Sequence, residues 1–95
     1  MGNIPDHVNK VERVLRESDF RLMQAGERHI SNEIYPTVKS EYPHLCDDSV
    51  MCEDTCGKGA NQEEWKHRVR TALGKLRDKP SSRVSKGPQN IWRFD

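Results

Sequence analysis

NQEEWKHRVRTALGKL, residues 61–76, decides the fold because it combines a helix cap, an apolar stripe and a basic flank. Asn61 is a favoured N-cap residue, and Glu64 three positions later completes the pattern of a capping box. The apolar residues recur at helical spacing on one face: Trp65, Val69, Ala72, Leu73 and Leu76. This stripe must face a core, so the sequence predicts an amphipathic helix over residues 61–77.

The opposite face of this helix is polar, and its two flanks are basic. The outward positions are Glu63, His67, Arg70, Thr71 and Gly74, flanked by Lys66 and Arg77 on one side and by Arg68 and Lys75 on the other. A helix of this kind can pack on a small domain and present its polar face to phosphates and base edges. We therefore interpret it as a recognition helix.

The charge of the chain is unevenly distributed. The 95 residues include 16 Lys and Arg against 15 Asp and Glu, a net charge of +1. From Trp65 to Asp95, however, nine cationic residues stand against only two acids. The C-terminal third is therefore a local basic surface within a nearly neutral chain, which favours an anionic partner.

Length and hydropathy restrict the class of protein. A chain of 95 residues with 33% hydrophobic residues makes one small domain, residues 1–95 with 1–5 as a frayed lead, and leaves little room for an enclosed active site. No apolar run is long enough to span a bilayer, and the N-terminus lacks the apolar core of a signal peptide. We expect a cytoplasmic protein that does not partner a membrane.

Two helices are expected before residue 44. Asp6 is positioned to cap the first, whose apolar spacing continues through Phe20 as far as Gly26, although Ser18 and Asp19 could divide it. Residues 27–30 form a short extended piece. Ser31 can cap the second helix, and its apolar residues repeat every fourth position: Ile30, Ile34, Val38 and Tyr42. Pro36 interrupts or delays this second helix, and the Tyr42-Pro43 pair ends it.

The C-terminal residues are predicted to form a β-hairpin. After a turn at residues 78–82, the segment 83–85 leads to a tip at 86–90 that contains Gly87 and Pro88, and a second strand follows at 91–94. In that strand Trp92 and Phe94 share one face, whereas Ile91 and Arg93 share the other. We expect the two aromatic residues to close the core against the tryptophan of the basic helix.

Taken together, the elements resemble a winged helix-turn-helix. The segment WKHRVRTALGKLRDKPSSRVSKGPQNIWRFD, residues 65–95, is similar to the winged-helix modules attached to restriction endonucleases, including HNH-type and methylation-dependent enzymes. The matching positions are Trp65, Arg68, Arg70, Leu73, Leu76, Gly87, Trp92, Arg93 and Phe94. The resemblance implies an α+β fold, with two or three helices before a C-terminal hairpin wing at 83–94.

The resemblance also implies binding to double-stranded DNA. His67, Arg70 and Thr71 would reach base edges in the major groove, and Gly74 would allow a close backbone approach. The phosphate contacts would come from Lys66, Arg77, Arg83 and Lys86. Such a protein would be a transcriptional regulator or a reader associated with restriction, with a nuclease or other protein as a further partner. The alternative is a winged-helix module that docks a protein without binding DNA.

A cysteine-containing loop at residues 44–60 offers a second kind of site. Cys46, Cys52 and Cys56 have the spacing C-x5-C-x3-C, and His67 or His44 could complete a tetrahedral set for zinc. The alternative is that the cysteines are reduced and that one or two are buried as small apolar side chains.

An enzyme is not expected. Acidic pairs at Asp47-Asp48 and Glu53-Asp54 lie close in sequence to His44 and could hold magnesium, but they belong to a loop. A nuclease site needs carboxylates fixed on rigid elements beside a base.

Overall fold

The computed structural model describes residues 5–51 and 62–95. Within them the fold is α+β, as the sequence predicts, with three α-helices; the predicted hairpin is part of a three-stranded antiparallel sheet, and the sequence did not predict its third strand pairing. The elements follow in the order α1 (Asp6–Glu17), β1 (Gly26–His29), η1 (Ile30–Ile34), α2 (Tyr35–Glu41), α3 (Glu64–Arg77), β2 (Val84–Lys86) and β3 (Ile91–Phe94). No helix in these two ranges is both long and apolar enough to cross a membrane.

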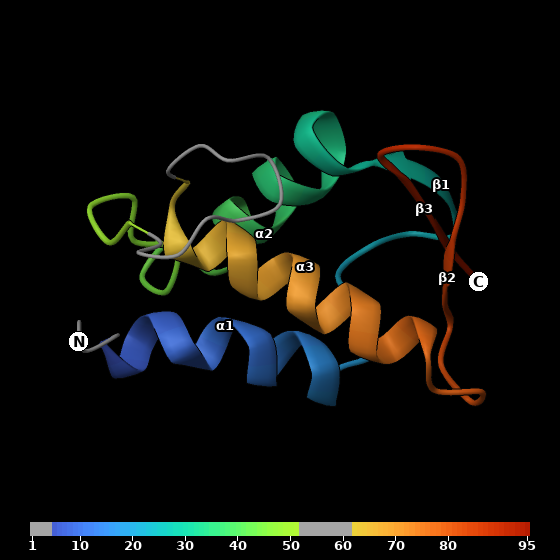
Figure 1. Ribbon diagram of the computed structural model, residues 1–95, viewed down its shortest axis with the longest axis horizontal. Coiled ribbons are helices and arrows are strands. Elements are labelled where there is room, and N and C mark those ends of the chain that lie inside the picture. Colours follow the sequence, from blue (N-terminus) through green and yellow to red (C-terminus); the bar gives the residue numbers. More distant parts are fainter. Residues whose placement is uncertain (1–4, 52–61) are drawn as a thin grey trace.

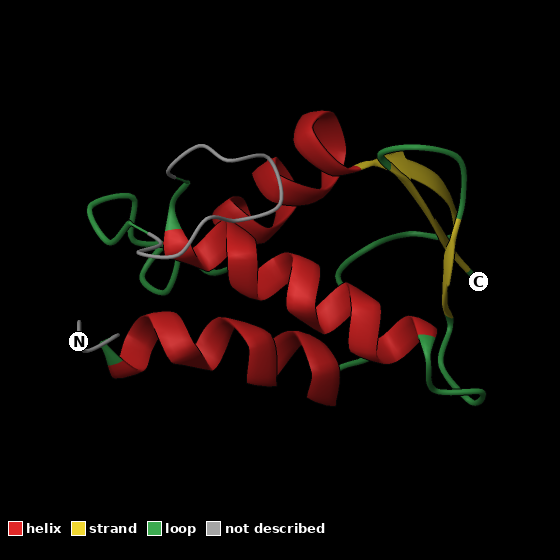
Figure 2. Cartoon of the chain, viewed as in Figure 1, coloured by secondary structure: helices red, strands yellow, loops and turns green. Residues whose placement is uncertain are grey.

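Helices α1 and α3 lie side by side and run in the same direction, and in this view α3 lies between α1 and α2 (Figure 1). The sheet stands beyond the C-terminal ends of α1 and α3 (Figure 2). Its strand order is β1-β3-β2, so β3 lies between the other two strands. The hairpin is therefore joined to a strand that comes before α2 in the sequence.

Helix α1 ends at Glu17, so the prediction of one helix reaching Gly26 is wrong. Asp19 and Phe20 adopt positive φ angles of 52° and 55°, a conformation that non-glycine residues seldom take and that cannot continue a helix. At the other end, Asp6 is the first helical residue and Pro5 occupies the N-cap position without a side-chain cap. An acidic residue in the first turn still interacts favourably with the helix dipole.

The turn after α1 is fixed by contacts with a segment distant in sequence. The Asp19 carboxylate accepts hydrogen bonds from Ser82 Oγ at 2.6 Å and from the backbone N–H of Arg83 at 3.0 Å. This turn places Phe20 in the core, where its ring centroid lies 5.6 Å from that of Phe94. A long-range contact, rather than local propensity, therefore decides where α1 stops.

The extended piece predicted at 27–30 is confirmed as β1. It pairs with β3 in the register Gly26↔Phe94 to His29↔Ile91. The next turn is π-helical, and His29 rather than Ser31 caps it, because His29 Nδ1 accepts from the backbone N–H groups of Ser31 and Asn32 at 3.2 Å. The capping prediction for Ser31 is therefore wrong.

Pro36 delays the second α-helix as predicted. Helix α2 begins at Tyr35, which places Pro36 in its first turn, and the turn before it is the π-helical η1. Tyr42 is the C-cap, and its backbone N–H donates to the carbonyl of Val38 at 2.8 Å. The predicted end before Pro43 is confirmed.

Helix α3 begins at Glu64 with Glu63 at its N-cap position, later than the predicted start at residue 61. The Glu64 backbone N–H donates to the carbonyl of Val50 at 2.8 Å, and Glu63, in extended conformation, forms a β-bridge with Met51. This bridge delays the start of the helix. Asn61, the predicted N-cap, lies outside the described residues.

The predicted hairpin is confirmed, although Lys86 belongs to β2 rather than to the tip. Its strands pair from Val84↔Phe94 to Lys86↔Trp92. The alternation in β3 is also confirmed, because Trp92 and Phe94 are buried whereas Arg93 is exposed.

The aromatic residues belong to one core but to two separate ring contacts. Phe94 meets Phe20, whereas Trp65 meets Tyr35 edge-on with ring centroids 5.7 Å apart. Trp92 and Phe94 were expected to close the core against Trp65. All three residues belong to the same buried cluster, but the ring contact of Phe94 is with Phe20 and that of Trp65 is with Tyr35. That cluster also holds the apolar faces of the helices: Val8, Val11, Leu15, Ile34, Val38, Val69, Ala72, Leu73 and Leu76.

Candidate nucleic-acid interface

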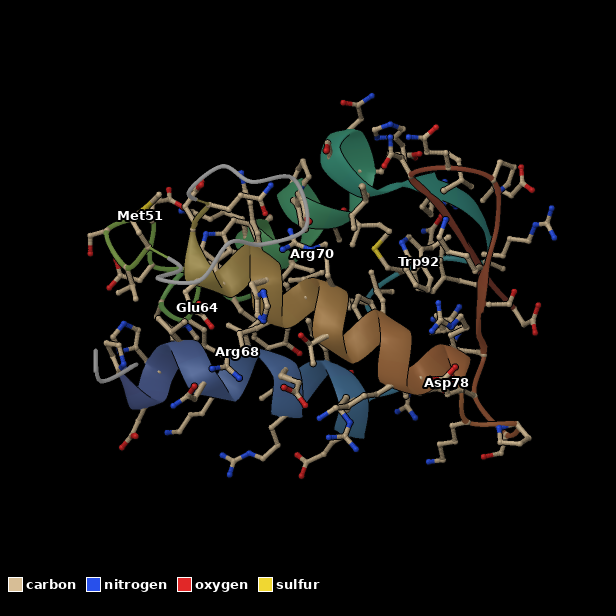
Figure 3. All side chains as sticks on the ribbon, in the orientation of Figure 1. Met51, Glu64, Arg68, Arg70, Asp78 and Trp92 are labelled. Carbon is tan, nitrogen blue, oxygen red and sulfur yellow. The ribbon has the colours of Figure 1, made fainter. Side chains whose placement is uncertain are left out.

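The two faces of α3 separate as the sequence predicts. Val69, Ala72 and Leu73 are fully buried, whereas the positions expected to face a ligand are partly exposed: Lys66, His67, Arg70, Thr71 and Gly74. Figure 3 shows that the arginines diverge, with Arg68 directed toward α1 and Arg70 toward α2. Only part of the basic character of α3 is therefore available to a ligand.

Two of the predicted contact residues, Lys66 and Arg70, lie close to Tyr35 of α2. Arg70 Nη1 donates to the Tyr35 hydroxyl at 3.2 Å and also to the side-chain oxygen of Gln62. Lys66 Nζ lies 3.1 Å from Glu63 Oε2 and 5.4 Å from the centroid of the Tyr35 ring. Arg70 is therefore bound within the protein, whereas the partly exposed ion pair of Lys66 can open at little cost.

Near the C-terminal end of α3, the polar face of the helix is open at Gly74. A Cβ atom built on Gly74 meets no described atom within 4 Å. One turn earlier, Thr71 Oγ1 donates to the carbonyl of His67 at 3.0 Å, which keeps the hydroxyl on the helix surface. Nothing in the described parts of the chain packs on this glycine, so a partner's backbone can approach α3 closely here.

A charge cluster between α1 and α3 was not predicted. Glu64 is 4% exposed, and its Oε2 lies 2.8 Å from Arg68 Nε. Glu12 of α1 accepts from Arg16 at 3.1 Å and from Lys75 at 2.9 Å, and its Oε1 lies 3.7 Å from Arg68. Burial raises the pKa of Glu12, but hydrogen bonds and charge from Lys75 and Arg16 outweigh it, so the pKa is lowered overall. The cluster joins the two helices through their polar edges.

In the hairpin, Lys86 carries a fixed and exposed positive charge. Its Nζ donates to the carbonyls of Gly87, Pro88 and Ile91 at 3.2, 2.9 and 3.3 Å, and it lies 5.2 Å from the centroid of the Trp92 ring. Neutral carbonyls hold the ammonium group without cancelling its charge. The end of β2 therefore offers a cation whose position is already set.

Arg83, for which the resemblance implies a phosphate contact, forms hydrogen bonds within the protein. Its Nη1 donates to the carbonyls of Phe20 and Met23 at 2.6 and 2.7 Å, and its Nε donates to the carbonyl of Asp95 at 2.9 Å. The guanidinium also lies 5.7 Å from the centroid of the Phe94 ring. Arg83 thus ties the turn after α1 to the C-terminal strand.

Arg77, at the end of α3, is exposed, and within the described ranges its ion pair is with the adjacent Asp78 at 3.2 Å. This carboxylate is 71% exposed, so the pair is screened by water and adds little to stability. Arg77 is therefore accessible to a phosphate, as the resemblance implies.

The described part of the cysteine loop is anchored through Asp48, a contact that the sequence did not reveal. Its Oδ1 accepts from Trp65 Nε1 at 2.7 Å, and its Oδ2 accepts from Lys39 Nζ at 2.5 Å. These hydrogen bonds from Lys39 and Trp65 lower the pKa of the Asp48 carboxyl. A carboxylate that appeared available for magnesium instead fixes the loop to α2 and α3.

Cys46 is a core residue. It is 1% exposed, its thiol donates to the carbonyl of Val38 at 3.7 Å, and burial raises the pKa of the thiol to about 11. Zinc binds the thiolate, which this environment disfavours. Cys52 and Cys56 lie outside the described residues, and within the described ranges no group of three His, Cys, Asp or Glu residues is arranged to hold a metal. The zinc site therefore stays a prediction.

Comparison with known protein families, with curated proteins and with solved structures gives no significant match to this chain.

Proposed function

We propose that this protein is a winged helix-turn-helix that binds double-stranded DNA through α3 and the β2–β3 hairpin. The support from the fold is the element order α1-β1-α2-α3-β2-β3 together with the strand order β1-β3-β2. In a winged helix, a strand after the first helix pairs with a hairpin after the third, which places the hairpin beside the recognition helix. The protein would act as a transcriptional regulator or as a DNA reader associated with restriction.

The open face at Gly74 is the observation that carries the proposal. The B-DNA major groove, about 12 Å wide, accepts an α-helix only where no other element covers that helix. Thr71 and His67 lie about one and two turns before this opening and would face base edges. Lys66, Arg77 and Lys86 would contact phosphates, so binding would depend strongly on salt. Arg70 and Arg83 belong instead to the framework that positions these elements.

A protein-docking role is less well supported. Stable protein interfaces are usually centred on buried apolar or aromatic anchors. In the described ranges, Met51 is the only exposed large hydrophobic residue, at 43% exposure. It lies near the N-terminal end of α3, away from the hairpin (Figure 3). The described surface therefore favours a charged, polar partner.

Substitutions of Gly74 test the proposal. Gly74→Ala is expected to raise the free energy of unfolding by about 0.5–1 kcal/mol, because alanine is the better helix former and the added methyl group has space. Gly74→Glu places a carboxylate in the proposed groove-facing surface and is expected to lower affinity for a duplex by at least about tenfold. Thermal unfolding and fluorescence anisotropy with a labelled duplex measure the two effects.

The alanine variant is the matched control, because it adds a Cβ at the same position without charge. If Gly74→Glu binds duplex DNA as tightly as Gly74→Ala, while both remain folded, then α3 does not enter the groove and the proposed function is wrong.

A further inference from the structure

A basic cleft lies between α1 and α3, near the ends of both helices. It has a volume of about 330 Å³ and is lined by Arg13, Arg16, Glu17, Lys75, Leu76 and Lys79. Because α1 and α3 run in the same direction, their C-terminal ends come together at this place (Figure 1). Four cationic side chains thus converge on a space that holds one carboxylate.

Two of these four cations form hydrogen bonds with a carboxylate of the protein. Arg16 and Lys75 both donate to Glu12, and cations in the last turn of a helix also interact favourably with its dipole. Arg13 and Lys79 are exposed, and their side chains have no hydrogen-bond or ion-pair partner in the described part of the chain. The cleft therefore carries positive charge that the protein does not use for its own stability.

We infer that this cleft binds backbone phosphates of the DNA duplex on the α1 side of α3, an inference that rests on the proposed function. A helix lying in the major groove has a phosphate strand along each of its sides. On the side of α1, Lys75 follows directly after the open position Gly74 and reaches across to α1. Arg13 and Lys79 would then contact the phosphates of the DNA strand on this side. Lys86 of the hairpin would contact the neighbouring part of the DNA backbone.

The lining of the cleft favours phosphate over an acidic peptide. Its one apolar member, Leu76, is 3% exposed, so the cleft offers no pocket that could anchor a peptide side chain. Arginine matches the oxygens of a phosphate through its planar, forked donors, and lysine supplies a point charge.

The test compares two double variants that lose the same charge. Arg13→Gln/Lys79→Gln removes the unpartnered cations of the cleft. Lys10→Gln/Arg21→Gln removes two exposed cations that do not line it. Affinity for a 20-base-pair duplex is measured by fluorescence anisotropy between about 50 and 200 mM salt. Thermal unfolding verifies that both variants remain folded.

The expected result is that the cleft variant loses about 1.8 units from the slope of log affinity against log salt, because each phosphate neutralised contributes about 0.9. The control variant should keep the wild-type slope. If both variants keep the wild-type slope, or if both lose the same amount from it, the inference about the cleft is wrong and the proposed function still stands. Absence of salt-dependent duplex binding by the wild-type protein would overturn both.

Discussion

Replacement of Arg83 by alanine is expected to lower the free energy of unfolding by about 2–3 kcal/mol. The guanidinium satisfies the carbonyls of Phe20 and Met23 in a partly buried position, and it packs against the Phe94 ring. Without it, carbonyls that water cannot fully reach lose their donor. Chemical denaturation followed by circular dichroism measures the change.

Arg93→Ala is the matched control for Arg83→Ala. Arg93 lies on the neighbouring strand and carries the same charge, but its ion pair with Glu27 is exposed, so its loss should cost less than about 1 kcal/mol. If the two variants are equally stable and Arg83→Ala instead weakens DNA binding, then Arg83 is a phosphate contact and the framework role is wrong.

Glu12→Gln is expected to destabilise the fold by about 2 kcal/mol at neutral pH, since hydrogen bonds to charged groups contribute about 1.5–3 kcal/mol. The Glu12 side chain is only 14% exposed, and it receives cations from both α1 and α3. Neutral glutamine cannot balance Arg16 and Lys75 together. Glu17→Gln, which removes an exposed carboxylate from the same helix, should leave the stability nearly unchanged.

The same glutamate predicts the sign of a pH dependence. Its pKa in the folded protein is lowered from the ordinary value of 4.5, so the unfolded chain takes up the proton first as the pH falls. The stabilisation from Glu12 is therefore present above pH 4.5 and is lost as the pH drops below that value. The stability difference between wild type and Glu12→Gln should shrink in this range, and a difference that stays constant from pH 7 to pH 3 would contradict the assigned ion pairs.

The local patterns of the sequence predicted the helices and the hairpin well. The stripe through Val69 and Leu73 is buried, and the alternation of Trp92 and Phe94 in β3 is present, because each depends on the repeat of one element. Pro36 delayed α2 for an equally local reason, the missing backbone N–H.

The errors arose where distant segments meet. The apolar spacing through Phe20 was compatible with a longer α1, and only the contact of Asp19 with Ser82 and Arg83 shows why the chain turns there. The start of α3 depends on the bridge between Met51 and Glu63. Neither pairing leaves a periodic signal in the sequence.

The same limit applies to the candidate interface. Nine cations in the C-terminal third indicated a basic surface, but the sequence did not show which of them already have internal partners. Arg70 and Arg83 are held by the protein, whereas Arg13 of α1, outside that basic third, joins Lys75 and Lys79 at one cleft. The sequence of α1 alone predicts the i,i+4 ion pair of Glu12 with Arg16. It does not predict that Lys75 of α3 also pairs with Glu12.

The most direct test of the central claim is the salt dependence of wild-type binding to a duplex. Phosphate contacts from Lys66, Arg77 and Lys86 predict a slope of about −2.7 or steeper for log affinity against log salt. Affinity that stays constant between about 50 and 200 mM salt, or no binding at the lower concentration, would contradict DNA recognition by α3 and the hairpin.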